Sequence, residues 1–142
     1  MADEDAWSRV ALFQSRDVLA RRYHARHGKE LAADKAAAII AHLEQARQYF
    51  RSAEMAGVLA APLEQYYGVL AFSRAIILFA AQQLVEADLE PAHGLSAVVP
   101  ACGVIENVII KSLKTGTFPQ LVKWTGNRPG RAIGAKSAES RI

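Results

Sequence analysis

The chain has 142 residues, a length typical of one domain, and 51% of them are hydrophobic, which is enough to build a core. Its single cysteine, Cys102, excludes a disulfide framework and a cysteine-based metal cluster, and the acidic opening Met1–Asp5 is unlike a secretory signal peptide. The net charge of +3 is uneven, because seven Lys and Arg residues oppose only Glu139 from Lys111 onward. We therefore expect a cytoplasmic protein with no metal and no cofactor.

The first expected helical segment runs from Asp5 to His27. It opens with a short apolar face, and Ser15 in its middle offers an N-cap for the residues that follow. Gly28 suits the C-cap position. One helix broken near Ser15 and two short helices fit the pattern equally well.

The second expected helix, Leu31–Ala56, has the clearest pattern. Its apolar residues recur at alternating steps of four and three, which predicts one buried stripe. The residues of that stripe are Ile39, Leu43, Ala46, Phe50, Ala53 and Gly57. Gly57 and Pro62 then predict a turn.

The third expected helix runs from Pro62 to about Asp88, with Pro62 in its first turn. The stripe predicted for it consists of Leu63, Tyr67, Leu70, Arg74, Ile77, Ala81 and Leu84. The apolar stretch 66–85 is about as long as a membrane span, but it contains Arg74. We interpret it as a buried helix and expect no membrane contact.

The pattern changes after Leu89. Residues 90–94 predict a loop, and the β-branched run 104–110 predicts either one strand or the end of a helix. A turn at 114–117 leads to a last apolar patch that ends at Trp124. From Gly126 onward the composition predicts disorder. We therefore expect a helical domain over residues 1–125 and a disordered basic tail over 126–142.

Three motifs carry a resemblance to a known family. The run 66–75 holds a paired tyrosine and an Arg-Ala step, His93-Gly94-Leu95 follows it, and Gly116-Thr117-Phe118 stands further along with Leu121. In order and spacing they resemble YaaC-like proteins, a bacterial family related to the HEPN helical domains. The resemblance covers about residues 5–124 and corresponds to the N-terminal part of that family. Together with the helical patterns it implies an all-α, HEPN-like bundle of four to five helices, with a small irregular or β element near residues 104–118.

Arg74 is the main candidate for a binding site, because an unpaired charge in an apolar stripe is costly. In one interpretation it forms an ion pair with Glu44 or Glu54, or extends its head group to solvent. In the other, its guanidinium binds phosphate or carboxylate in a polar pocket. The other walls of that pocket are Tyr66, Tyr67 and His93.

HEPN ribonucleases carry an Arg-x4–6-His pair, and Arg22 with His27 meets that spacing here. The pair lies in the first helical segment, whereas the enzymes place theirs late in the bundle, so we interpret the match as a coincidence. An alternative use of the region is electrostatic, because basic residues able to contact phosphates gather there. They are Arg16, Arg21, Arg22, Arg26 and Lys29.

The functional expectation rests on these residues and on the resemblance. HEPN-like domains recur in toxin–antitoxin and phage-defence proteins. We expect a binding or interaction module of a bacterial stress or phage-defence system that joins a protein partner or a second copy. It can engage nucleic acid through its basic residues, or a phosphate-bearing ligand. The alternative is a HEPN-type ribonuclease or toxin, in which Arg22 and His27 would be catalytic.

Overall fold

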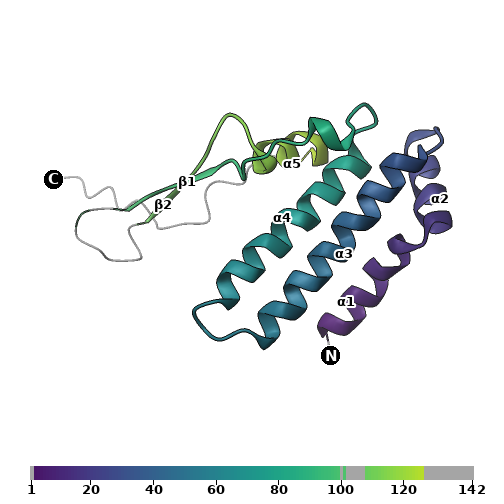
Figure 1. Ribbon diagram of the computed structural model, residues 1–142. Helices are drawn as coiled ribbons and strands as arrows, with labels where there is room; N and C mark the ends of the chain where they lie inside the picture. The colour runs from purple at the N-terminus through teal and green to yellow at the C-terminus, as the bar shows by residue number, and fades with distance from the viewer. Residues whose placement is uncertain (1, 100, 102–107, 127–142) are drawn as a thin grey trace. The chain divides into compact units, whose positions relative to one another are not determined.

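The computed structural model describes residues 2–99, 101 and 108–126 (Figure 1). The chain divides into two compact units, Met1–Leu89 and Glu90–Ile142. Within the described residues there are five α-helices and one two-stranded antiparallel sheet. The predicted all-α bundle with a small β element is therefore confirmed. Cys102 and, apart from Gly126, the predicted tail over 126–142 lie outside the described residues.

The N-terminal segment of the first unit forms two helices. Helix α1 spans Ala2–Ala11, a 3-10 turn covers Leu12–Gln14, and α2 spans Arg16–His27. Ser15 between them has an extended backbone (φ −77°, ψ 122°), which ends the first helical stretch. Gly28 closes α2 in the left-handed conformation at φ 65°, and its N–H donates to the carbonyl of His24. Of the two alternatives for this segment, two short helices is the one observed.

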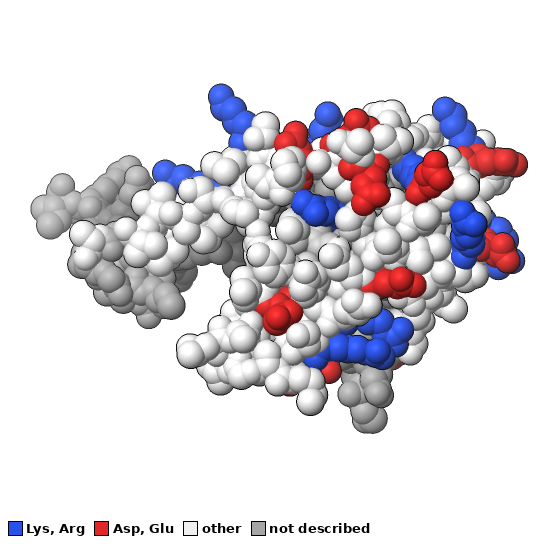
Figure 2. All heavy atoms as spheres, viewed as in Figure 1, with Lys and Arg blue, Asp and Glu red and all other residues white. Residues whose placement is uncertain are grey.

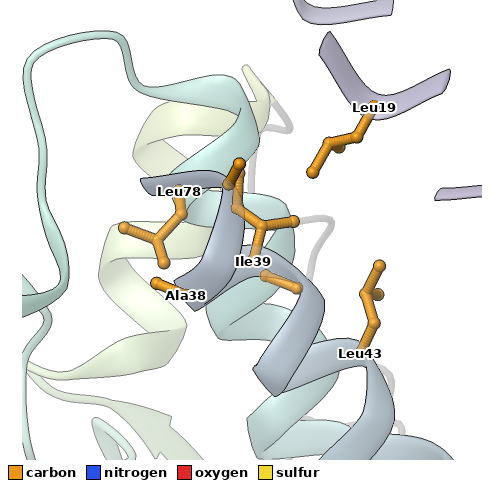
Figure 3. Close-up of a cluster of buried hydrophobic side chains, with 7 residues drawn as sticks. Leu19, Ala38, Ile39, Leu43 and Leu78 are labelled. Atoms are coloured by element: carbon orange, nitrogen blue, oxygen red, sulfur yellow. The ribbon is translucent and has the colours of Figure 1, made fainter. Parts of the chain in front are cut away.

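The core of the first unit is built on an antiparallel helix pair. Helix α3 spans Ala33–Met55 and α4 spans Ala61–Ala80, and the two run side by side (Figure 1). The predicted α3 stripe is buried at Ile39, Leu43, Ala46 and Ala53, with Phe50 half-buried. Leu19 of α2 and Leu78 of α4 close on Ile39, as Figure 3 shows. Burial of this periodic face is the main force that holds the helices together.

The stripe predicted for α4 is wrong in its first half. Leu63 is 57% exposed and Tyr67 is 41% exposed, although both belong to the predicted stripe. The buried face consists instead of small residues, which are Gly68, Ala71 and Ala75. A Cβ placed on Gly68 would lie 3.1 Å from the ring of Phe50. The helices approach so closely here that the contact face takes small side chains and leaves the large ones outside.

Helix α4 is also shorter than predicted, because it ends at Ala80 and not near Asp88. The carbonyls of Ala81 and Gln82, just past its end, accept hydrogen bonds from the Lys35 ammonium. A 3-10 turn at Glu86–Asp88 follows. No helix of the described residues combines the length and the apolarity that a bilayer crossing requires.

The second unit contains a β ribbon and a short helix. Strand β1, Leu95–Val98, pairs antiparallel with β2, Ile109–Ser112, in the register Leu95 opposite Ser112. Helix α5 spans Thr117–Thr125. Strand β2 lies inside the predicted β element at 104–118, whereas β1 was not expected.

Candidate functional site

The two tyrosines of the predicted pocket lie on the exposed first half of α4. The ring of Tyr67 stacks on Tyr49 of α3 at a centroid distance of 5.5 Å and an interplanar angle of 28°. The ring of Tyr66 meets Tyr67 edge-on at 5.2 Å. Three aromatic rings therefore form one cluster on the surface of the helix pair, where they combine apolar faces with polar hydroxyls.

Arg74 lies on α4 seven residues after Tyr67, which places the two on one helix face about 10.5 Å apart along the axis. It is half-buried, and its positive charge acts on His42, a buried residue of α3. Burial lowers the pKa of His42, Arg74 lowers it further, and the nearby Glu86 carboxylate opposes both effects. His42 Nε2 lies 3.4 Å from Glu86 Oε1. Arg74 thus belongs to a polar cluster with His42 and Glu86, two residues that were not among the predicted site residues.

His93 lies in the second unit. Its Nδ1 accepts a hydrogen bond from the backbone N–H of Leu95 at 3.0 Å, which fixes the turn into β1. The two tyrosines and Arg74 belong to the first unit. A pocket formed by all four residues therefore stays a prediction.

The structure gives a physical reason for two of the three family motifs. Gly94 and Gly116 have φ values of 82° and 124°, and a Cβ on Gly116 would lie only 2.3 Å from the Cα of Gly94. The N–H groups of Thr117 and Phe118 donate to the carbonyls of Ala92 and His93 at 2.8 and 2.9 Å. The His-Gly-Leu and Gly-x-Phe motifs therefore cross as one backbone contact that only glycine permits.

The candidate catalytic pair leaves α2 in different directions. Arg22 and His27 are five positions apart, which turns their side chains about 140° apart around the helix axis. Arg22 is exposed. His27 Nε2 is 2.8 Å from the carbonyl oxygen of Phe79, and its ring packs on Tyr23 at 4.4 Å. A carbonyl can only accept, so Nε2 carries the proton and Nδ1 alone remains for proton transfer.

Lys35 is a buried charge that the sequence reasoning missed. Its Nζ donates to the carbonyls of Ala81 and, at 3.0 Å, Gln82, and it lies 5.5 Å from the ring centroid of Tyr23. Burial lowers its pKa. The sequence did contain a sign of its burial, because Lys35 lies four residues before Ile39, which lies four residues before Leu43, so all three share the buried face of α3. A cation here complements the negative end of the α4 dipole.

The other end of the helix pair is apolar and exposed. Met55 is 89% exposed and Leu59 is 98% exposed, and the nine residues from Met55 to Leu63 include no charged side chain. Figure 2 shows this connection between α3 and α4 as an uncharged corner of the first unit. We define the apolar end surface by its exposed large residues. They are Met55, Val58, Leu59, Leu63, Tyr66 and Tyr67.

The described residues contain no group of three or more His, Cys, Asp or Glu side chains that could share a metal ion. Comparison with curated proteins and with solved structures gives no match. The sequence model of the YaaC-like protein family matches residues 9–136. This match spans most of the chain and includes the glycine crossing and the tyrosine pair. The chain therefore belongs to the YaaC-like protein family.

Proposed function

We propose that the chain is a binding and interaction module that acts in the cytoplasm as part of a bacterial stress or phage-defence system. One observation carries this proposal, the apolar end surface between α3 and α4. Contiguous exposed apolar surface on a soluble monomer is commonly functional, because leaving it in water has a free-energy cost. Residues at a helix–helix connection are usually polar, so nine uncharged residues there favour a docking role.

A ligand that carries phosphate or carboxylate is the small-molecule class that we propose for this module. Tyr66 and Tyr67 expose their rings on α4, and Arg74 follows on the same helix. A guanidinium can bind an oxyanion bidentately, and tyrosine rings about two helical turns away can pack against the rest of an extended ligand.

Nucleic acid is a second class of partner that the basic residues can serve. Arg21, Arg22, Arg26 and Lys29 are exposed on or just after α2, and Arg16 at its start is exposed as well. Figure 2 shows acidic and basic residues mixed over the visible face of the first unit. We therefore propose weak binding with a shallow dependence on salt, since few phosphates would be neutralised.

The context of the module is argued by analogy. We propose that the bundle is HEPN-like, as the family resemblance implies, because HEPN-like domains recur in toxin–antitoxin and phage-defence proteins. A helical bundle with one unpartnered apolar end is compatible with assembly in such a system. The assignment to a stress or phage-defence system therefore rests on analogy with the family, whereas the binding role rests on the apolar end surface.

The alternative, a HEPN-type ribonuclease or toxin, rests on the spacing of Arg22 and His27. The engagement of His27 with Phe79 and the divergence of the two side chains favour the binding module. In that arrangement His27 supports the end of α4, and general acid–base work would require its ring to leave this contact.

A cleavage assay with two variants tests the proposal. The purified chain is incubated with labelled single-stranded RNA and the products are resolved by denaturing electrophoresis. We expect no cleavage above a protein-free control, for the parent or for His27→Gln, whose amide can still donate to the Phe79 carbonyl. Cleavage that disappears in both His27→Gln and Arg22→Ala, with melting temperatures unchanged, would replace the module with the ribonuclease.

A further inference from the structure

We propose that the apolar end surface binds the same surface of a second copy of this chain, so that two α3–α4 connections meet around a two-fold axis. This inference rests on the proposed function, because it names the partner of the interaction module. The surface was not singled out by the sequence patterns, which placed Leu63 and Tyr67 in the core. Two features argue for a second copy, the amount of apolar surface and the charges around it.

The amount of surface suits a specific interface. A fully exposed aliphatic side chain presents roughly 60–120 Å² of apolar surface. Weighted by their exposed fractions, the six residues of the apolar end surface present on the order of 400 Å². A standard interface buries about 800 Å² per partner, a little over half of it apolar. One copy therefore offers about the apolar area that its half of a stable dimer needs.

The charges around the surface suit a self-complementary partner. Arg47 and Arg51 precede Met55 at spacings of four along α3, so they lie on one line of the helix. Glu54 and Glu64 flank the uncharged segment at its two ends. The rim thus includes at least two positive and two negative side chains. In a two-fold interface each sign on one copy can meet the opposite sign on the other.

This balance argues against an anionic partner. Nucleic acid and anionic membranes favour a clear excess of Lys and Arg around the contact. The two glutamates would repel either of them. A second copy needs no net charge, because its own rim supplies the complement.

The surface is held in place before any partner arrives. Tyr67 stacks on Tyr49 across the helix pair, and Gly68 fits against the ring of Phe50. Phe50 in turn packs on Trp7 of α1 at 5.5 Å. A rigid surface of this kind loses little conformational entropy on docking, which favours association.

Sedimentation velocity on the full chain tests the inference with a matched pair of variants. Leu63 on the apolar end surface and Leu12 elsewhere in the first unit are 57% and 58% exposed. We expect the parent at micromolar concentration to sediment with twice the 15.4 kDa mass of one chain. Leu63→Lys should raise the dimer dissociation constant at least tenfold, and Leu12→Lys should leave it within twofold of the parent.

Charge exchange at the rim provides a second test. Arg51→Glu or Glu54→Arg alone places like charges across the two-fold axis and should weaken the dimer severalfold. The double variant should recover most of the parent's affinity. A dimer equally strong in Leu63→Lys, or a double variant weaker than both single ones, would refute this interface.

The same measurements separate this inference from the proposed function. A monomeric parent refutes the second copy. If that monomer also co-sediments with neutral phosphatidylcholine vesicles and Leu63→Lys abolishes this, the surface docks on lipid and the module survives. A monomer whose melting temperature falls by several degrees in Leu63→Lys, and not in Leu12→Lys, would show that the surface is covered within the chain. That result would refute both proposals.

Discussion

The two ends of the α3–α4 pair are built in opposite ways. At one end, where α3 begins and α4 stops, His27 contacts the Phe79 carbonyl of α4 and Lys35 donates to the carbonyls of Ala81 and Gln82 just past the helix. At the other end, the segment Met55–Leu63 has no charged residue and exposes its large side chains. A bundle that closes one end with a buried cation, Lys35, has the chemistry to close the other. The contrast favours the interpretation that the exposed apolar end binds a partner.

The largest effect is expected for Lys35→Met. Methionine keeps most of the volume and removes the ammonium that the Ala81 and Gln82 carbonyls accept from. Leaving two acceptors unsatisfied should lower the free energy of unfolding by about 3 kcal/mol. Urea unfolding followed by circular dichroism measures it. Lys29→Met, which alters an exposed lysine between α2 and α3, is the control. Equal losses in the two variants would mean that this end is not closed by Lys35.

A smaller loss is expected for His27→Ala. The change removes the hydrogen bond to the Phe79 carbonyl and the packing of the ring on Tyr23, and should cost about 2 kcal/mol. His27→Gln retains a donor and should lose less. Thermal unfolding of the two variants side by side gives the difference. If glutamine is no better than alanine, the hydrogen bond contributes nothing to this end.

The polar cluster on the flank of the helix pair should make stability depend on pH. Because the folded pKa of His42 lies below its unfolded value of about 6.5, the unfolded state binds the proton first as the pH falls. The titration of His42 therefore leaves the free energy of unfolding unchanged above about pH 6.5. Below that pH it lowers the free energy of unfolding by at most about 1.4 kcal/mol per pH unit. Urea unfolding at pH 7.5 and 5.5 measures the slope. His42→Gln should flatten it, and His24→Gln, at an exposed position of α2, is the matched control. An unchanged slope in His42→Gln would assign the effect to other groups.

The smallest effect is expected at the open end. Val58→Ser and Leu59→Ser alter side chains that are almost fully exposed, so the free energy of unfolding should change by less than about 0.5 kcal/mol. The measurement must be made at a concentration low enough to keep copies apart, because association adds to apparent stability. A loss comparable to that of Lys35→Met would show that both ends are closed alike.

The helix content could be predicted from sequence because the α3 stripe follows the helical period closely. Ser15 and Gly28 were also expected at helix boundaries, and α2 begins after Ser15 and ends before Gly28. The residues of α4 that face α3 could not be predicted in this way. Periodicity favours the large side chains Leu63 and Tyr67, whereas the contact with α3 is close enough to require Gly68 and Ala71. Strand β1 was missed because a four-residue strand has too few positions to show alternation.

The candidate site was only partly accessible from sequence. Arg74 was singled out by its apolar neighbours, and it does lie near other titratable groups. His42 and Glu86 could not be assigned to it, since they come from separate elements that meet only in the folded unit. The apolar end surface was also missed. Hydrophobic residues at helical spacing predict a buried core, so Leu63 and Tyr67 were assigned to the core although they are exposed.

The glycine crossing also fixes an order of events during folding. Helix α5 has nine residues, too few for a stable isolated helix, and its first N–H groups donate to carbonyls at Ala92 and His93. We therefore expect a loop of about 25 residues to close before the helix starts. We predict that a peptide of residues 115–126 is unfolded by circular dichroism, and that pulse-labelled amides of α5 gain protection only after those of Leu113. Helical signal in the isolated peptide would show that α5 guides the closure and does not wait for it.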